Sequence, residues 1–151
     1  MDRWDEKGKG KIVKILQDGC IAPDILGICK FMMYMGLTLD HFAKIISALT
    51  NWNIDGKELL KIGERVINLQ KLFNIREGFK YEDDLLPERM KEIPAFGDYK
   101  DQERCAISNY EEMLKEYYEE RGWDKKTGEP LKEKLKELGL DWFIEEVKDK
   151  K

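Results

Sequence analysis

Residues 55–73 constrain the fold more than any other part of the sequence. Apolar residues recur there at alternating spacings of three and four positions, as Leu59, Ile62, Val66, Leu69 and Phe73. That spacing places all of them on one face of an α-helix. Asp55 stands in front of this stripe and Glu58 follows three residues later, which is the pattern of an N-terminal capping box. The sequence therefore predicts a long amphipathic helix that must bury one face against other elements.

Most of the remaining chain also carries helical signals. Thr38 and Ser108 are expected N-caps, and Ser108 forms a second capping box with Glu111. Gly122 and Gly139 are expected to end helices. The helices predicted in addition to 55–73 are 12–18, 24–36, 38–51, 108–122 and 130–139, and a last short helix that carries Trp142, Phe143 and Val147. Because the sequence contains no convincing strand hairpin and no internal repeat, the predicted fold class is all-α.

Two regions interrupt the helical pattern. No apolar stripe persists in residues 74–107, which contain Gly78, Pro87, Pro94 and Gly97. We predict a long central loop there, with a short helix after Pro87, and a loop of this length is commonly functional or packed on a partner. Residues 1–11 are polar and charged and are predicted to be a mobile lead-in. The expected architecture is an irregular multi-helix domain over residues 12–151.

The segment 24–36 is apolar at almost every position. It follows Gly19–Pro23, which predicts a break between two helices. A helix that is apolar on most sides is a buried helix, and a chain of 151 residues has difficulty covering one completely. Without any further information, Asp24 is a natural N-cap of this helix. Cys29 is then a small buried hydrophobic residue.

Composition excludes several classes of function. Charged residues make up 38% of the chain and the net charge is -4, with basic and acidic residues interleaved. This is the pattern of solvated helix faces, so no nucleic-acid partner is expected. No apolar run reaches the roughly 18 to 20 residues of a membrane span. The charged N-terminus is unlike a secretory signal, and we expect a cytoplasmic protein without a membrane partner.

The three cysteines, Cys20, Cys29 and Cys105, form no CxxC pair, and His41 is the only histidine. No complete metal site can be read from their spacing. An odd number of cysteines without close pairing also argues against a disulfide framework. This chain could nevertheless supply one ligand to a metal site that is completed by another polypeptide segment.

Several blocks together are similar to one enzyme family. Asp24–Cys29 has the form Asp-x-x-Gly-Ile-Cys and resembles the Asp-x-x-Gly-Leu-Cys motif of the tungsten aldehyde:ferredoxin oxidoreductase family, with Ile28 in place of leucine. The other blocks that resemble this family, in the same order and at similar spacing, are Asn74–Phe79, Asp83–Arg89, Glu111–Tyr118, Arg121–Asp124 and Lys134–Leu140. The resemblance covers nearly everything from about residue 11 onward and is to the C-terminal part of the family.

The resemblance implies a role for each residue of the motif. Cys29 would be the fourth thiolate ligand of a 4Fe-4S cluster, and thiolate is the ligand that such a cluster needs. Asp24 would accept hydrogen bonds from a pterin of the tungsten-bis(pterin) cofactor. Gly27 would let the backbone approach that cofactor closely, and Ile28 could add a main-chain contact. The family's other three cluster cysteines, its first pterin-binding segment and its Glu and His near the tungsten have no counterpart here.

The residues outside the motif have plainer interpretations. His41, Cys20 and Cys105 match no functional position, and His41 is expected at the helix surface or in a satisfied polar contact. The resemblance suggests that the charged residues of the central loop brace it in the whole enzyme, with no catalytic role; they are Arg76, Glu77, Asp83, Asp84 and Arg89. The aromatic pairs are expected in the core, and they are Tyr117 with Tyr118 and Trp142 with Phe143.

The resemblance leads to two functional hypotheses. In the first, the chain is a C-terminal fragment or subunit of an enzyme that oxidises aldehydes to carboxylic acids and passes electrons through the 4Fe-4S cluster to ferredoxin. Its partners would then be the remaining N-terminal domains or subunit, ferredoxin and the aldehyde substrate, and the chain alone would be inactive and would bind neither cofactor. In the second, it is a cofactor-free helical interaction module that binds a partner through the apolar face of Ile25–Met35.

Overall fold

The computed structural model describes residues 4–143 of the chain, and within them it confirms the all-α class. The α-helices are α1 Lys9–Ile25, α2 Phe31–Tyr34, α3 Leu39–Thr50, α4 Gly56–Arg76, α5 Tyr110–Arg121 and α6 Lys132–Glu137. The 3-10 helices are Tyr81–Asp84, Glu88–Lys91 and Glu103–Cys105. In these residues the β-structure is limited to one isolated bridge between Trp123 and Pro130. No helix in the described part is long and apolar enough to cross a membrane.

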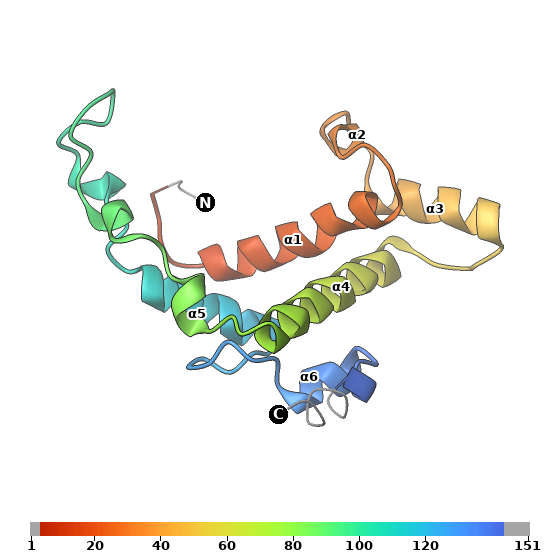
Figure 1. Cartoon of the computed structure of the whole chain (residues 1–151). Coiled ribbons are helices and arrows are strands. Elements are labelled where there is room, and N and C mark those ends of the chain that lie inside the picture. Colours follow the sequence, from red (N-terminus) through yellow and green to blue (C-terminus); the bar gives the residue numbers. More distant parts are fainter. Residues whose placement is uncertain (1–3, 144–151) are drawn as a thin grey trace.

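Helices α1 and α4 form the centre of the molecule. They lie side by side in opposite directions, with α3 packed on α4 at one end and α5 packed on α1 at the other (Figure 1). Two glycines permit the close approaches. A Cβ at Gly63 of α4 would overlap the carbonyl oxygen of Asp18 in α1, and a Cβ at Gly10 would lie 2.5 Å from the amide nitrogen of Tyr117 in α5. Residues 77–109 extend away from the paired helices as a long connection (Figure 1).

The core is divided into three small clusters along this frame. One joins α1, α3 and α4 and contains Ala22, Phe42, Ala43 and Leu59. The second lies around α5 and contains Leu114, Tyr118 and Trp123, and the third lies around α6 and contains Leu135, Leu138 and Leu140. Large apolar side chains remain exposed elsewhere, most strongly Tyr34 at 82% and Met35 at 86%. The described chain therefore leaves much of its apolar surface uncovered.

The first helix differs from the prediction. α1 begins at Lys9, inside the segment predicted as a lead-in, and it continues through Gly19–Pro23, where a break was predicted. Pro23 lacks the N–H that would bond to the preceding turn, which normally costs about 3 kcal/mol in a helix interior. Pro23 is fully buried and Ala22 belongs to the first core cluster, so tertiary packing outweighs the local preference.

The prediction of a buried helix over 24–36 was wrong. Asp24 lies in the last turn of α1 and is not an N-cap. The rest of the segment 24–36 contains only the four-residue helix α2. Several of the apolar side chains in this segment are exposed, namely Ile25, Phe31, Met32, Tyr34 and Met35. An apolar segment is usually buried, which is why a buried helix was predicted. Leu26, Ile28 and Met33 do pack against the first core cluster, but the described residues leave the other apolar side chains of this segment uncovered.

The capping predictions were mostly confirmed. Thr38 is the N-cap of α3 in a reciprocal arrangement with His41, which gives that histidine a satisfied polar contact. The Asp55 side chain accepts a hydrogen bond from the Glu58 amide at 2.8 Å and begins α4. The Ser108 prediction was wrong, because α5 starts after Asn109 and its N-cap makes no side-chain hydrogen bond.

The later boundaries agree better with the sequence. Gly122 ends α5 in the left-handed conformation, with φ 68°, and α6 lies between Pro130 and Gly139. The 3-10 helix Glu88–Lys91 confirms the short helix predicted after Pro87.

The predicted core aromatics divide into buried and exposed residues. Tyr118 and Phe143 are buried as predicted, whereas Tyr117 is half-buried and Trp142 is exposed, so Trp142 is not a core residue among residues 4–143. Val147 of the predicted last helix lies outside the described residues.

Candidate functional site

The motif Asp24–Cys29 forms the turn that ends α1. The N–H of Ile28 donates to the carbonyl oxygen of Pro23 at 2.9 Å, and the N–H of Gly27 donates to that of Asp24 at 3.3 Å. Gly27 is in the left-handed conformation, with φ 67°. These two bonds and this conformation define a Schellman motif, in which glycine after the C-cap satisfies the last helical carbonyls. The spacing of the motif therefore has a structural cause, since the glycine must stand where the helix stops.

The turn brings all four predicted site residues together and gives them different environments. Ile28 packs against the first core cluster and anchors the turn. Asp24 and Cys29, on either side of the glycine, are both exposed. A Cβ placed on Gly27 would meet nothing within 4 Å, so its outer side is open. The Asp24 carboxylate pairs with the ammonium of Lys30, with Oδ2 and Nζ 2.8 Å apart.

The donor set at this turn fits one part of a shared cofactor site, and the described residues do not complete such a site. Cys29 offers an exposed thiol, which as thiolate is the ligand of iron-sulfur clusters. Asp24 offers an exposed carboxylate, which can accept hydrogen bonds from a flat N–H edge. No group of three or more Cys, His, Asp or Glu side chains that could hold a metal ion occurs among the described residues. Any cluster held here needs its other ligands from elsewhere.

Uncovered apolar surface surrounds the turn. Val13, Leu16 and Cys20 follow one another at helical spacing on α1, and the same face continues to Asp24. Val13 and Leu16 are exposed and Cys20 is half-buried. On the other side of the turn, α2 presents exposed Phe31 and Tyr34. The motif thus lies within an apolar face that another protein segment could cover.

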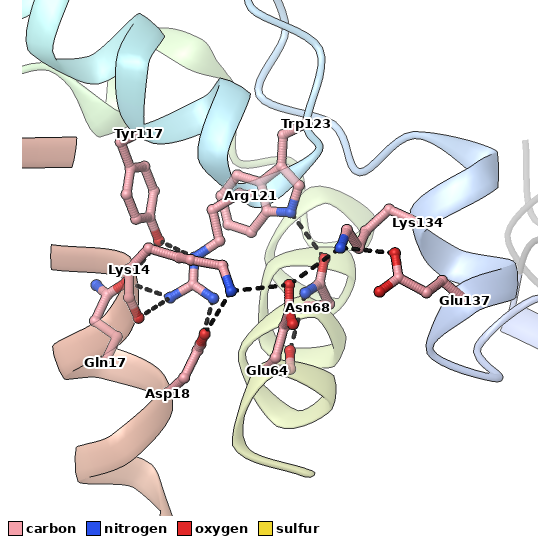
Figure 2. A network of polar contacts seen from close by, with 10 residues as sticks. All are labelled: Lys14, Gln17, Asp18, Glu64, Asn68, Tyr117, Arg121, Trp123, Lys134 and Glu137. Carbon is pink, nitrogen blue, oxygen red and sulfur yellow. Dashed lines mark hydrogen bonds and ion pairs between the residues drawn. The ribbon is translucent and has the colours of Figure 1, made fainter. Parts of the chain in front are cut away.

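A charged cluster lies along the middle of α1 and was not predicted (Figure 2). The Arg121 guanidinium of α5 pairs with the Asp18 carboxylate, and both side chains are fully buried. Arg121 Nη2 also donates to Gln17 Oε1 at 2.7 Å, and its Nε donates to the Tyr117 hydroxyl at 3.0 Å. The only sequence signal for this cluster was the position of Arg121 at the end of a predicted helix.

The cluster extends across α4 to α6. Lys14 lies 3.0 Å from Asp18 and 3.3 Å from Glu64, and Lys134 lies 3.3 Å from the same Glu64 oxygen. Lys134 also pairs with Glu137 at 2.8 Å. Three cations, Lys14, Arg121 and Lys134, thus balance three carboxylates, Asp18, Glu64 and Glu137. Because the charges compensate one another inside the helix contacts, we assign this network to the fold rather than to chemistry.

Asp84 anchors the start of the long central loop. Its carboxylate pairs with Lys71 of α4 and accepts a hydrogen bond from the Tyr118 hydroxyl of α5 at 2.5 Å. The Asp83 carboxylate accepts a hydrogen bond from the amide of Lys80 at 2.8 Å and so caps the 3-10 helix Tyr81–Asp84. Burial and the neighbouring Asp84 carboxylate raise the pKa of Tyr118 above its usual value. These contacts agree with the bracing role expected for the loop acids. Arg76 pairs with its neighbour Glu77 at the surface and lies over the Phe73 ring, 4.6 Å from its centroid.

Comparison with known proteins places the chain in one family. A family model described as "Aldehyde ferredoxin oxidoreductase, domains 2 & 3" matches residues 1–140. The tungsten-containing aldehyde ferredoxin oxidoreductase of Pyrococcus abyssi is 36% identical over 137 residues, which are 90% of this chain and 22% of that protein. The corresponding protein of Thermococcus kodakarensis is 33% identical over 137 residues, again 90% of this chain and 22% of the relative.

The fold also has a counterpart among solved structures. The active site complex BamBC of benzoyl coenzyme A reductase in complex with 1,5-dienoyl-CoA contains a chain that superposes with a TM-score of 0.73. The likeness covers 99% of this chain and 22% of that one, at 24% sequence identity, and it is a likeness of fold.

The chain belongs to the aldehyde ferredoxin oxidoreductase family, as a C-terminal domain of it. It spans about a fifth of the length of the curated relatives that it matches.

Proposed function

We propose that this chain is the C-terminal part of a tungsten-pterin aldehyde:ferredoxin oxidoreductase and that it supplies one cluster ligand, Cys29, and one pterin contact, Asp24. The single observation that carries the proposal is the exposure of both side chains on one Schellman turn within an uncovered apolar face. A free cysteine is among the residue types most often buried, so the exposure of the Cys29 thiol is unusual for a residue that serves only the fold. When bound, the tungsten-pterin centre supplies the two-electron oxidation of aldehyde to carboxylic acid, with ferredoxin as the acceptor.

The chain's own residues would act by position. The turn holds Cys29 and Asp24 five positions apart in sequence on either side of Gly27, so a cluster ligand and a pterin contact would come from the same rigid segment. Ile28 fixes that segment to the core through its side chain and its hydrogen bond to Pro23. The open outer side of Gly27 would leave room for a close approach to the backbone. This placement would keep the electron path between the two centres short.

The test is assembly with the missing part of the enzyme. The chain is to be co-expressed with a polypeptide that carries the upstream region of the family, and the purified complex assayed for iron, sulfide, tungsten and aldehyde-dependent dye reduction. We expect a brown, active complex, while the chain by itself gives no activity. A variant Cys29→Ser should lose the cluster's iron. The matched control is Cys20→Ser on the same face of α1, which should keep it.

Each result separates the two hypotheses. A colourless, metal-free complex between the two polypeptides would favour the cofactor-free interaction module, for which the exposed side chains of α2 are the supporting observation. Retention of the full cluster in Cys29→Ser would reject the ligand role. Aldehyde oxidation by this chain alone would reject its being only a part of the enzyme.

A further inference from the structure

One cation lies at the motif that the sequence analysis did not single out. Lys30 follows Cys29 directly and is the N-cap residue of α2, whereas Asp24 lies in the last turn of α1. Their ion pair, with Nζ 2.8 Å from Oδ2, closes the turn from outside, and Gly27 and Cys29 lie in the loop between them. Lys30 thus pairs with the predicted pterin contact and is next in sequence to the predicted cluster ligand.

The pair leaves the carboxylate able to bind a further group. Lys30 contacts Oδ2 of Asp24, and within the described residues Oδ1 makes no hydrogen bond or ion pair. A carboxylate held by one oxygen keeps a defined orientation for a second hydrogen-bond donor at the other.

Solvent exposure now makes this pair weak, and covering it would change its importance. Exposed ion pairs contribute little to stability because water screens both charges. If another polypeptide covers the turn, the same two charges lose their water. A carboxylate in such a place is costly unless its partner stays with it. We therefore expect the Asp24 carboxylate to need the Lys30 ammonium as its partner only in the assembled enzyme, where both groups are covered.

We propose that Lys30 is a positioning residue of the assembled site, which orients the Asp24 carboxylate toward its ligand and places a positive charge beside the cluster thiolate of Cys29. This inference rests on the proposed function. Two consequences follow from the charge. Without Lys30 the pterin contact loses its orienting partner, and the cluster loses a neighbouring cation that favours its reduced, more negative state.

The test uses the co-expressed complex and compares three variants. Lys30→Met removes the charge, Lys30→Arg keeps it, and Lys44→Met removes an exposed lysine of α3 as a matched control. The readouts are the pterin-to-protein ratio and the midpoint potential of the cluster, followed by electron paramagnetic resonance. We expect Lys30→Met to lower the pterin ratio and to shift the potential to more negative values. Lys30→Arg should restore both, and Lys44→Met should change neither.

The outcomes distinguish this inference from the proposal beneath it. An unchanged pterin ratio and potential in Lys30→Met, with the cluster present, would overturn the role of Lys30 and leave the ligand role of Cys29 intact. Retention of the cluster in Cys29→Ser would overturn both. If Lys30→Met fails to assemble, adding Asp24→Asn should restore assembly, because no unpaired charge is then covered. Failure of that double variant would count against the inference.

Discussion

Helix α1 carries two carboxylates that lie in opposite environments. Near its middle, Asp18 is sealed against Arg121 of α5 and neither side chain is exposed to solvent. In its last turn, Asp24 pairs with Lys30 in the open. Both are carboxylate–cation pairs on the same helix. They differ in whether the rest of this chain covers them, and that difference separates a pair that holds the fold from one that is available to a partner.

The sealed network needs its partners to be complete, because a buried charge without compensation costs several kcal/mol. The buried carboxylates Asp18 and Glu64 are balanced by cations from α1, α5 and α6. The open pair has no such requirement while water surrounds it. A mutational series that contrasts the sealed network near the middle of α1 with the open turn at its end should therefore show large effects on stability at the network and small effects at the turn.

The largest effect is expected from Arg121→Ala. The substitution leaves the buried Asp18 carboxylate without its guanidinium and also removes the hydrogen bonds to Gln17 and Tyr117. The free energy of unfolding should fall by about 3–5 kcal/mol. Urea denaturation followed by circular dichroism measures it. The double variant Asp18→Leu with Arg121→Met should lose less than Arg121→Ala, and a loss below about 1 kcal/mol in the single variant would show that the network is not sealed.

The next effect tests the contact between α1 and α4. Gly63→Ala places a methyl group against the Asp18 carbonyl oxygen, which is backbone and cannot move aside alone. We expect a loss of about 1–3 kcal/mol from overpacking. The matched control is Gly19→Ala, a buried helical glycine whose added Cβ would meet only Leu60 Cδ1 at 4.0 Å. That variant should be neutral or more stable by up to about 1 kcal/mol. Equal losses in both variants would contradict the close approach at Gly63.

These two sites show where sequence reasoning succeeded and where it could not. The stripe from Leu59 to Phe73 and the caps Thr38 and Asp55 are local signals, and the helices that they predicted are present. The sealed network joins residues about a hundred positions apart, and no local spacing in the sequence predicts such a pairing. The motif from Asp24 to Cys29 could be singled out from its residues, but its local structure was not predicted. Tertiary burial of Ala22 and Pro23 carried α1 past its expected end.

A smaller effect is expected at the loop anchor. Tyr118→Phe removes one hydrogen bond to Asp84 and leaves Lys71 in place. The loss at pH 7 should be about 1–2 kcal/mol, measured as before. Because the folded state raises the pKa of Tyr118, it keeps the phenol protonated, while the unfolded chain ionises it near pH 10. The stability advantage over the variant should therefore shrink as the pH rises above about 10. A constant difference from pH 7 to 11 would contradict this account of the anchor.

The smallest effect is expected at Cys29, and it bears most directly on the contrast between the sealed network and the open turn. Cys29→Ala in the isolated chain should change the free energy of unfolding by less than about 0.5 kcal/mol, because the exposed thiol makes no contact that the fold requires. Asp18→Ala, measured beside it, should be far more damaging because it leaves Arg121 buried without its carboxylate. A loss above about 1 kcal/mol at Cys29 would mean that the turn depends on the thiol. The exposure of that thiol would then no longer indicate a ligand for a site shared with a partner. The open turn at the end of α1 would instead serve the fold, as the sealed network does.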